Sequence, residues 1–259
     1  MRRTAGRLAA TISNVLIKAC LNGARGLDEH PALPVSPEQL AAEAQRAVAA
    51  GAGALHVHPR AADGSQTLDS AACDAAILAI RHACPGVPVG ASTASFVEPD
   101  PARRLRLIGA WTERPDFASA NFREEGVLEL CDLLHRVGIG IEAGIATVAD
   151  AEALVDSGWA RRLVRVLVEP RDPEPADAVA EAERISAALD RADVNAHRVY
   201  HGFDVATWPV IELGLSGGWD VRVGLEDTLR LPDGGIPSGN ADLVAAVVAM
   251  ARKRGRWPA

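Results

Sequence analysis

Short apolar segments alternate along this chain with longer segments in which apolar residues recur every three or four positions. The short segments predict β-strands, and the longer ones predict amphipathic helices. We expect strands at residues 15–20, 54–58, 87–92, 116–120, 139–143, 163–169, 196–202 and 220–224. The helices that follow them are expected at residues 36–54, 69–84, 99–110, 124–138, 147–157, 176–192, 204–214 and 239–253.

The first expected helix carries clear boundary signals. Ser36 has the side chain of a good N-cap, Pro37 suits the first turn, and Gln39 can complete a capping box. Gly51 is expected to end the helix, because glycine readily adopts the left-handed conformation found there.

The strand–helix units are joined by connections that are too long for hairpins but suit parallel crossovers. A doubly wound sheet could also hold eight strands, but no GxGxxG sequence follows the first one. Evenly spaced units therefore favour an α/β fold of the closed (β/α)8 type, the TIM barrel. The chain has 259 residues and shows neither a linker nor a low-complexity segment, so we expect a single barrel domain over residues 1–259.

The charge of the chain argues against nucleic acid as a partner. The formal net charge is −7, whereas a nucleic-acid-binding domain needs a clustered basic face. One basic run, at residues 251–257, is better explained as the end of the last helix, where positive charge suits the helix dipole.

Targeting signals and cysteine usage indicate a cytoplasmic protein. No apolar run approaches the ~18 residues that a membrane span needs, and Ser13, Asn14 and Lys18 interrupt any signal-peptide core. Four cysteines lie far apart without a CxxC pair, which fits reduced thiols: Cys20, Cys73, Cys84 and Cys131. We therefore expect no membrane partner.

The expected second strand ends in two histidines. His56 and His58 lie two residues apart, so their side chains point the same way and can share one cation at about 2.1 Å. The alternative is a pair of histidines that hydrogen-bond to neighbouring loops. Glu226 follows the eighth strand, which lies two places from the second in a closed barrel, and it can complete a site of two histidines and one carboxylate. Such a site keeps open positions, as catalytic zinc sites do.

Other strand ends carry costly polar groups. Glu142, within the apolar sequence IGIEAGI, suits a general base or a substrate clamp, or else a structural ion pair with an arginine. Arg222 and Asp227 flank the eighth strand end, where the acidic residues can also be the ordinary start of a helix. Neutral side chains that can orient a carboxylate or an enolate oxygen, or simply cap helices, are Ser92, Thr93, Ser119 and Asn121.

Together these residues give the chain a resemblance to a known family. The segments NGAR, HVHPR, GASTAS, FASAN, IEAG and VRVGLEDT follow one another along essentially the whole chain, and the sequence resembles the β-keto acid cleavage enzyme family. The resemblance implies a zinc-dependent reaction in which a β-keto acid and acetyl-CoA give acetoacetate and a new acyl-CoA. It also implies a homo-oligomer.

The resemblance assigns roles to individual residues. His56, His58 and Glu226 are expected to hold Zn²⁺. Asp227 with Arg222 is expected to transfer the proton, and Glu142 to act as a base or an orienting group. Contacts to the substrate's carboxylate and oxygens are expected from Ser92, Thr93, Ser119 and Asn121.

Two segments depart from the family's pattern. Where members that take amino-substituted substrates carry an acidic residue, this chain has Arg25, which favours an anionic or polar distal group if it points inward. Where the family has a glycine-rich loop on the CoA side, residues 168–177 read VEPRDPEPAD. That replacement leaves a metal-dependent lyase or aldolase without CoA as an open alternative.

Two further alternatives fit less well. Metal-dependent amidohydrolases also use an HxH pair in a barrel, but on the first strand and with histidines after the fifth and sixth, whereas here the fifth ends near Glu142. A non-catalytic barrel that binds a small acid has little use for four charges at its mouth, those of Glu142, Arg222, Glu226 and Asp227.

Overall fold

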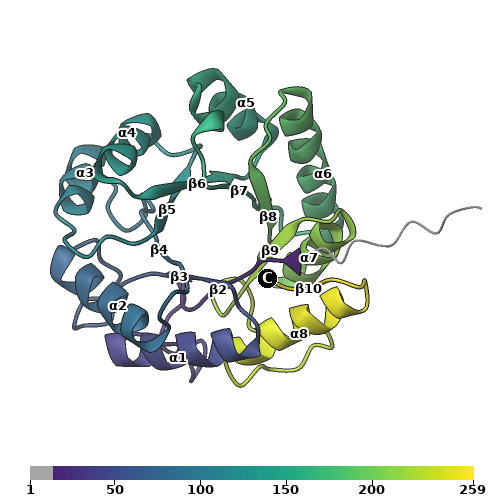
Figure 1. The fold of residues 1–259 in the computed structure, drawn as a ribbon, viewed down its shortest axis with the longest axis horizontal. Helices are drawn as coiled ribbons and strands as arrows, with labels where there is room; N and C mark the ends of the chain where they lie inside the picture. The colour runs from purple at the N-terminus through teal and green to yellow at the C-terminus, as the bar shows by residue number, and fades with distance from the viewer. Residues whose placement is uncertain (1–13) are drawn as a thin grey trace, which may run out of the picture.

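The computed structural model describes residues 14–259, and it shows a closed barrel of eight parallel strands surrounded by helices (Figure 1). The strands follow one another around the barrel in chain order, from β2 to β9. The predicted TIM barrel is therefore confirmed. Residues 1–13 of the predicted domain lie outside the described residues.

Each predicted strand of the barrel is present. The barrel strands are β2 (Ile17–Cys20), β3 (Ala54–Val57), β4 (Val89–Ala91), β5 (Phe117–Asn121), β6 (Gly140–Ile145), β7 (Arg165–Val168), β8 (His197–Tyr200) and β9 (Asp220–Val223). The helices outside them are α1 (Pro37–Ala50), α2 (Ser70–Ala83), α3 (Pro101–Gly109), α4 (Val127–Val137), α5 (Val148–Ser157), α6 (Pro175–Arg191), α7 (Thr207–Ser216) and α8 (Asn240–Arg252). Short 3₁₀ turns, η1 (Trp159–Arg161) and η2 (Asp204–Ala206), precede β7 and α7.

The boundaries expected for the first helix are confirmed at its N-terminus. The Ser36 side chain accepts a hydrogen bond from the backbone N–H of Gln39, and the Gln39 side-chain oxygen accepts one from the backbone N–H of Ser36, which closes a capping box. Gly51 caps the last turn with φ of +117°, as predicted, so the helix ends at Ala50 and the expected range of 36–54 was too long.

The first predicted strand, residues 15–20, is divided in two. β1 (Asn14–Val15) pairs with β10 (Trp257–Pro258) in a separate two-stranded sheet, and only β2 joins the barrel. Between them, the backbone N–H of Leu16 donates to the Asp220 carboxylate at 2.8 Å. A side chain far along the chain causes this break, so the local apolar pattern does not show it.

The fifth predicted strand is longer than expected. The prediction ended it at residue 143, but β6 continues to Ile145, because Ala143, Gly144 and Ile145 all find ladder partners on β7. Glu142 is therefore the third residue of a six-residue strand and pairs in register with Ser119 and Arg165. Its carboxylate lies within the barrel, below the strand end.

The interior of the barrel is partly charged. Lys18 and Arg222 are register partners on β2 and β9, so both side chains face the same side of the sheet. Phe117 packs against Lys18, whose ammonium lies 5.7 Å from the ring centre. Gly90 makes room for that ring, since a Cβ there would lie 2.0 Å from Phe117 Cε2. The aliphatic side chains of the strands pack outward against the helices instead.

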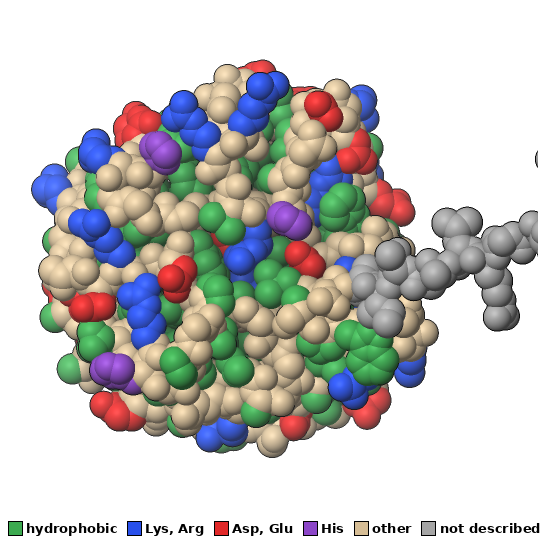
Figure 2. Space-filling model, in the orientation of Figure 1, with side chains coloured by type: hydrophobic (Ala, Val, Ile, Leu, Met, Phe, Trp, Pro, Cys, Tyr) green, Lys and Arg blue, Asp and Glu red, His purple; other side chains and the backbone are tan. Residues whose placement is uncertain are grey.

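On the face shown in Figure 2, basic and acidic side chains are interspersed. The four cysteines are buried and free, as predicted. Burial raises the pKa of the Cys131 thiol to about 12, so this side chain stays protonated. Within residues 14–259, no helix is both long and apolar enough to cross a membrane.

Candidate metal and active site

A cavity of about 450 Å³ opens at the carboxyl ends of the barrel strands. Eight of the predicted site residues line it: Arg25, His56, His58, Ser92, Ser119, Asn121, Arg222 and Glu226. Three others, Thr93, Glu142 and Asp227, are buried beside or below it. Glu169 and Arg171, which the sequence did not single out, also line the cavity.

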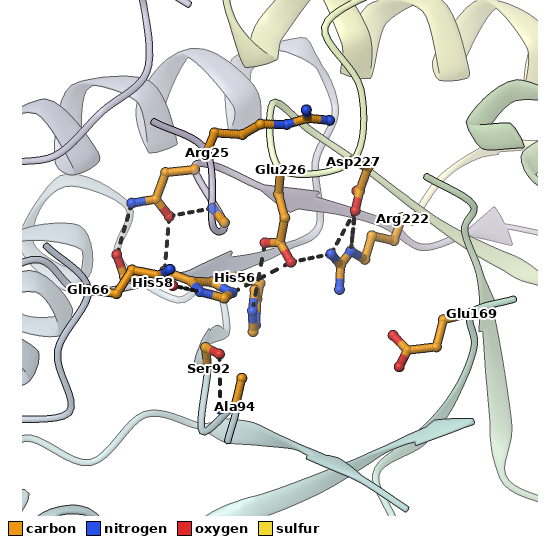
Figure 3. A network of polar contacts seen from close by, with 12 residues as sticks. Arg25, His56, His58, Gln66, Ser92, Ala94, Glu169, Arg222, Glu226 and Asp227 are labelled. Carbon is orange, nitrogen blue, oxygen red and sulfur yellow. Dashed lines mark hydrogen bonds and ion pairs between the residues drawn. The ribbon is translucent and has the colours of Figure 1, made fainter. Parts of the chain in front are cut away.

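His56, His58 and Glu226 converge at one side of this cavity (Figure 3). One ligand atom from each lies within 4.8 Å of the others. The Glu226 carboxylate is 3.8 Å from Nε2 of His56 and 3.5 Å from Nε2 of His58. β3 provides His56, the residue after it provides His58, and Glu226 comes three residues after β9. As expected from the barrel geometry, the Glu226 side chain at the end of β9 extends past β2 to the two histidines at the end of β3.

The protonation states of this cluster suit a divalent metal ion. Burial lowers the pKa of His56 well below its usual range, so its imidazole is neutral and keeps a lone pair. Burial alone would raise the pKa of Glu226, but the charge of Arg222, with the nearby rings of His58 and His56, more than offsets this and lowers it well below the usual range. Among the described residues, no group donates a hydrogen bond to Oε2 of Glu226, although that oxygen is buried. An ionised carboxylate oxygen left without a donor next to two imidazoles fits a metal ion.

Two amide side chains hold His58 in place. Oε1 of Gln66 lies 2.5 Å from Nδ1 of His58, so that nitrogen carries the proton and Nε2 faces Glu226. Oδ1 of Asn22 accepts the backbone N–H of His58 at 2.9 Å, and its amide group donates to the His58 carbonyl. Neither residue was predicted, because each is a single polar side chain in a loop without a spacing pattern.

Gly23 lets Glu226 approach this cluster. Its φ of +58° is in the left-handed region, and a Cβ there would lie 2.2 Å from Cγ of Glu226. The NGAR segment therefore contributes its glycine to the cluster of His56, His58 and Glu226.

Arg222 hydrogen-bonds both to Glu226 of the His–His–Glu cluster and to Asp227. Its Nε donates to both carboxylate oxygens of Asp227, at 3.1 and 3.2 Å, and Nη2 donates to Asp227 at 2.6 Å and to Glu226. Burial alone would lower the pKa of Arg222, but the two carboxylates raise it well above its usual value. For Asp227, burial outweighs the arginine, and its pKa is raised. The two neighbouring carboxylates therefore differ in proton affinity.

His201 lies between Asp227 and a further buried carboxylate, that of Glu169. Nε2 of His201 donates to Glu169 at 3.1 Å, and its Nδ1 lies 3.7 Å from Asp227. Burial lowers the pKa of His201, so the ring is neutral. His201 therefore acts as a structural hydrogen-bonding residue between two carboxylates. Glu169 was included only in the predicted strand at residues 163–169 and in the segment at residues 168–177.

Glu142 has two cationic partners inside the barrel. Nζ of Lys18 lies 2.5 Å from one carboxylate oxygen, and Arg165 pairs with the other. Burial alone would raise the pKa of Glu142, and the two cations lower it. The role predicted for Glu142 as a base or an orienting group stays a prediction, and these contacts favour its alternative, a structural ion pair.

The neutral side chains differ in their freedom to bind a ligand. Ser92 and Ser119 line the cavity from the ends of β4 and β5. The hydroxyl of Thr93 donates to the Ser119 carbonyl, so this side chain links two strands and is not free to donate to a ligand. Nδ2 of Asn121 donates to Glu124 at 2.8 Å.

Arg25 lines the rim of the cavity but already has partners. It donates to Glu29 at 3.1 Å and also to Asp204, which lies in the turn before α7. Two carboxylates therefore balance this single guanidinium, and its free capacity for an anionic group of a ligand is reduced.

Comparison with known proteins gives one family and several relatives. A family model described as beta-keto acid cleavage enzyme matches residues 14–154 and 145–259. The 3-keto-5-aminohexanoate cleavage enzyme of Fusobacterium nucleatum is 29% identical over 95% of this chain and 94% of its own. The enzyme of the same name from Acetoanaerobium sticklandii is 23% identical, again over 95% of this chain and 94% of its own.

Among solved structures, ObcA in a ternary complex with a C4-CoA adduct and oxalate superimposes with a TM-score of 0.71 at 20% identity. The match covers 88% of this chain, which spans only 65% of the ObcA chain. A binary complex of ObcA with oxaloacetate gives a TM-score of 0.70 at 19% identity over the same shares. At this identity the likeness shows the fold, a TIM barrel.

Proposed function

Because this chain belongs to the β-keto acid cleavage enzyme family, we propose that it catalyses acetyl-CoA-dependent cleavage of a β-keto acid with the aid of Zn²⁺. The β-keto acid transfers its acyl group to CoA, and its remaining carboxymethyl carbon takes the acetyl group. The products are acetoacetate and a new acyl-CoA. The observation that carries the proposal is the convergence of His56, His58 and Glu226 beside the Arg222–Asp227 pair.

The three metal-binding side chains would hold the zinc ion. Two imidazoles and one carboxylate leave further positions open for a substrate, as in catalytic zinc sites. When bound, Zn²⁺ would supply a Lewis acid that polarises the keto group and favours the enolate form of the acid.

Asp227 and Arg222 would move the proton. The reaction begins with loss of a proton from the carbon between the keto and carboxylate groups, which needs a base with a pKa above that of a free aspartate. Burial raises the pKa of Asp227 in this direction, and three contacts to Arg222 hold its carboxylate in place. Glu142 is further back, and any orienting effect it has would act through Lys18 or Arg165.

Polar groups on the opposite wall would bind the rest of the acid. Ser92 and Ser119 line the cavity near the histidines and can donate hydroxyl hydrogens to the substrate's carboxylate or keto oxygen. Asn121 lies next along β5 and would contact the acid further from the reacting carbons.

Acetyl-CoA as the second substrate is supported by relatives. The two curated enzymes cleave 3-keto-5-aminohexanoate by name, and ObcA binds a C4-CoA adduct. Residues 168–177, where the resemblance implied a glycine-rich loop on the CoA side, read VEPRDPEPAD, and this keeps a CoA-independent metal-dependent lyase or aldolase as the second candidate. The homo-oligomer implied by the family is also part of the proposal, and sedimentation of the purified protein would test it.

One assay separates the two candidate functions. Purified protein loaded with Zn²⁺ is incubated with a panel of β-keto acids with and without acetyl-CoA, and acetoacetate and acyl-CoA are quantified. We expect both products only when acetyl-CoA is present, and loss of both in Glu226→Gln. Consumption of the keto acid at the same rate without acetyl-CoA would favour the lyase, and no consumption of any acid would contradict both.

A further inference from the structure

We propose that Asn240 is a positioning residue for the His–His–Glu cluster, because its side-chain amide sets the separation of two backbone segments that lead to that cluster. The inference rests on the zinc site of the proposed function, and it concerns a residue on the outer layer of the barrel. Asn240 is the first residue of α8 and is fully buried. Its amide makes hydrogen bonds to three separate parts of the chain.

The amide of Asn240 bridges the ends of two neighbouring strands. The register of β2 and β9 extends to the pair of Ala19 and Val223. Beyond that pair, Nδ2 of Asn240 donates to the Leu21 carbonyl at 3.0 Å, and Oδ1 accepts the backbone N–H of Leu225 at 2.9 Å. The side chain therefore continues the connection between the two strands where their direct pairing has ended.

Both bridged segments lead to metal-binding residues. The N–H of Leu21 donates to the His56 carbonyl at 3.0 Å, and Leu225 is followed directly by Glu226. A continuous path of hydrogen bonds thus runs from the backbone of His56 through Leu21 and Asn240 to the residue before Glu226. Loss of the amide interrupts this path at its centre, and it deprives a buried carbonyl and a buried N–H of their partner, which is costly.

The position of Glu226 depends on both segments. Gly23 lies two residues after Leu21, and a Cβ there would be 2.2 Å from Cγ of Glu226, so the glutamate side chain passes directly against this backbone. On β9, a Cβ at Gly224 would lie 1.9 Å from the Cys20 carbonyl oxygen, so the two strand ends are also in direct contact. With the backbones this close, a shift of either segment moves the carboxylate relative to the two histidines.

Glu43 fixes the orientation of the Asn240 amide. It is buried on α1, which packs against α8 (Figure 1). Oε2 of Glu43 accepts the backbone N–H of Asn240 at 3.1 Å and Nδ2 at 2.9 Å, while Oε1 accepts Nε of Arg46 at 2.8 Å. The amide nitrogen therefore faces two acceptors and the amide oxygen faces a backbone N–H. A flipped amide would lose all three of these bonds, so the bridge has one arrangement.

The test measures zinc dissociation constants by competition with a chromophoric chelator. Asn240→Ala is expected to weaken zinc binding by about tenfold or more, as loss of a residue that holds a metal ligand in place typically does. Glu43→Gln keeps an acceptor but loses the charge, and should weaken binding by about threefold or more. Asp74→Ala is the control, because Asp74 on α2 likewise accepts two backbone N–H groups, from Thr112 and Glu113, and it should bind zinc as the wild type does.

Co²⁺ in place of zinc gives a second readout, since its visible absorption depends on the number and geometry of its ligands. The spectrum of Asn240→Ala should shift toward that of Glu226→Gln, because the glutamate is displaced in one variant and replaced in the other. Asp74→Ala should keep the wild-type spectrum. Neither readout uses turnover, so a failure to cleave β-keto acids would contradict the proposed function without affecting this test.

Zinc affinity within about twofold of the wild type in both Asn240→Ala and Glu43→Gln, with unchanged Co²⁺ spectra, would overturn the role of Asn240. Equal weakening in Asp74→Ala would overturn it too, since affinity would then follow the loss of any such bridge. If circular dichroism shows that Asn240→Ala does not fold, Glu43→Gln decides by the same two readouts. If the wild type binds neither ion, the zinc site of the proposed function fails, and hydrogen exchange of the Leu225 amide decides the bridge: faster exchange in Asn240→Ala supports it, and an unchanged rate overturns it.

Discussion

Oε1 of Gln66 lies 2.5 Å from Nδ1 of His58, and this contact determines which nitrogen of His58 faces Glu226. The amide oxygen can only accept a hydrogen bond, so Nδ1 must carry the proton. Nε2 is then the nitrogen with the lone pair, and it is the one 3.5 Å from the Glu226 carboxylate. Gln66 thus prepares the imidazole for a metal ion without touching the ion itself.

Gln66→Leu is expected to weaken zinc binding by about 10- to 100-fold, since partners of metal-binding histidines typically contribute that much to affinity. Competition with a chromophoric chelator measures the dissociation constant. Gln45→Leu on α1, whose amide bonds only to the Ala83 carbonyl, is the matched control and should bind zinc as the wild type does. Equal affinities in both variants would show that Gln66 does not control His58.

Substitutions of the adjacent residues Glu226 and Asp227 are expected to affect different functions, metal binding for Glu226 and proton transfer for Asp227. Glu226→Gln should lose bound zinc, because it removes the only carboxylate of the metal cluster. Asp227→Asn should keep zinc but lose about 10²- to 10⁴-fold in kcat, the usual contribution of a general base. Metal content by mass spectrometry and steady-state kinetics on the same preparations distinguish the two. A zinc-free Asp227→Asn protein would instead make Asp227 part of the metal site.

Glu169 makes the stability of the fold dependent on pH. Its pKa is lowered to about 2 from 4.5, although burial alone would raise it, because the hydrogen bond from His201 and the charge of Arg171 prevail. A carboxyl group whose pKa falls on folding stabilises the native state above its unfolded pKa and loses this effect as pH falls toward the folded value. The difference in free energy of unfolding between wild type and Glu169→Gln should therefore shrink by about 2 kcal/mol between pH 6 and pH 3.

Urea denaturation at several pH values across that range measures the difference. Glu152→Gln on α5, an exposed carboxylate, is the control and should show a difference from the wild type that does not vary with pH to this extent. A constant difference for Glu169→Gln as well would mean that its carboxyl group titrates alike in the folded and unfolded chain.

The sequence was sufficient for the barrel and for eight of the residues that line the cavity. Strand and helix patterns are local, and in a closed barrel the carboxyl ends of all strands meet at one face, so His56, His58 and Glu226 could be placed together from their positions alone. The reach from the eighth strand to the second depends only on strand order, which the chain order fixes.

What the sequence did not predict depends on where single side chains point. Gln66 and Glu169 lie in loops, where no periodicity reveals direction, and each is identified only by its contact with a histidine. Glu142 was expected at a strand end, but the ladder continues past it to Ile145, and Lys18 meets it from across the barrel. Lys18 and Glu142 lie 124 residues apart in the chain, so no local sequence pattern indicates this contact.

Arg25→Ala is expected to weaken substrate binding less than the removal of an arginine without carboxylate partners would. Glu29 and Asp204 already pair with it, so its removal leaves two carboxylates at the rim that repel an anionic acid. KM for 3-oxoadipate should rise several-fold, with kcat changed less than twofold, because the contact is the same in the ground state and the transition state. An unchanged order of preference between cationic and dicarboxylic acids, with unchanged KM for both, would show that Arg25 does not face the substrate.

The variant Glu142→Gln distinguishes a catalytic role of Glu142 from a structural one. Removing one partner of a buried ion pair typically costs about 3–5 kcal/mol, because the remaining charges stay buried without compensation, so Glu142→Gln should lower the free energy of unfolding by about that amount. Zinc content should be unchanged, since Glu142 contacts Lys18 and Arg165 and none of the metal-binding side chains. Glu113→Gln, which breaks an exposed pair with Arg81, should cost less than about 1 kcal/mol in the same urea denaturation. A Glu142→Gln protein with wild-type stability and a kcat reduced more than 100-fold would reverse this assignment and make Glu142 the base predicted from the sequence.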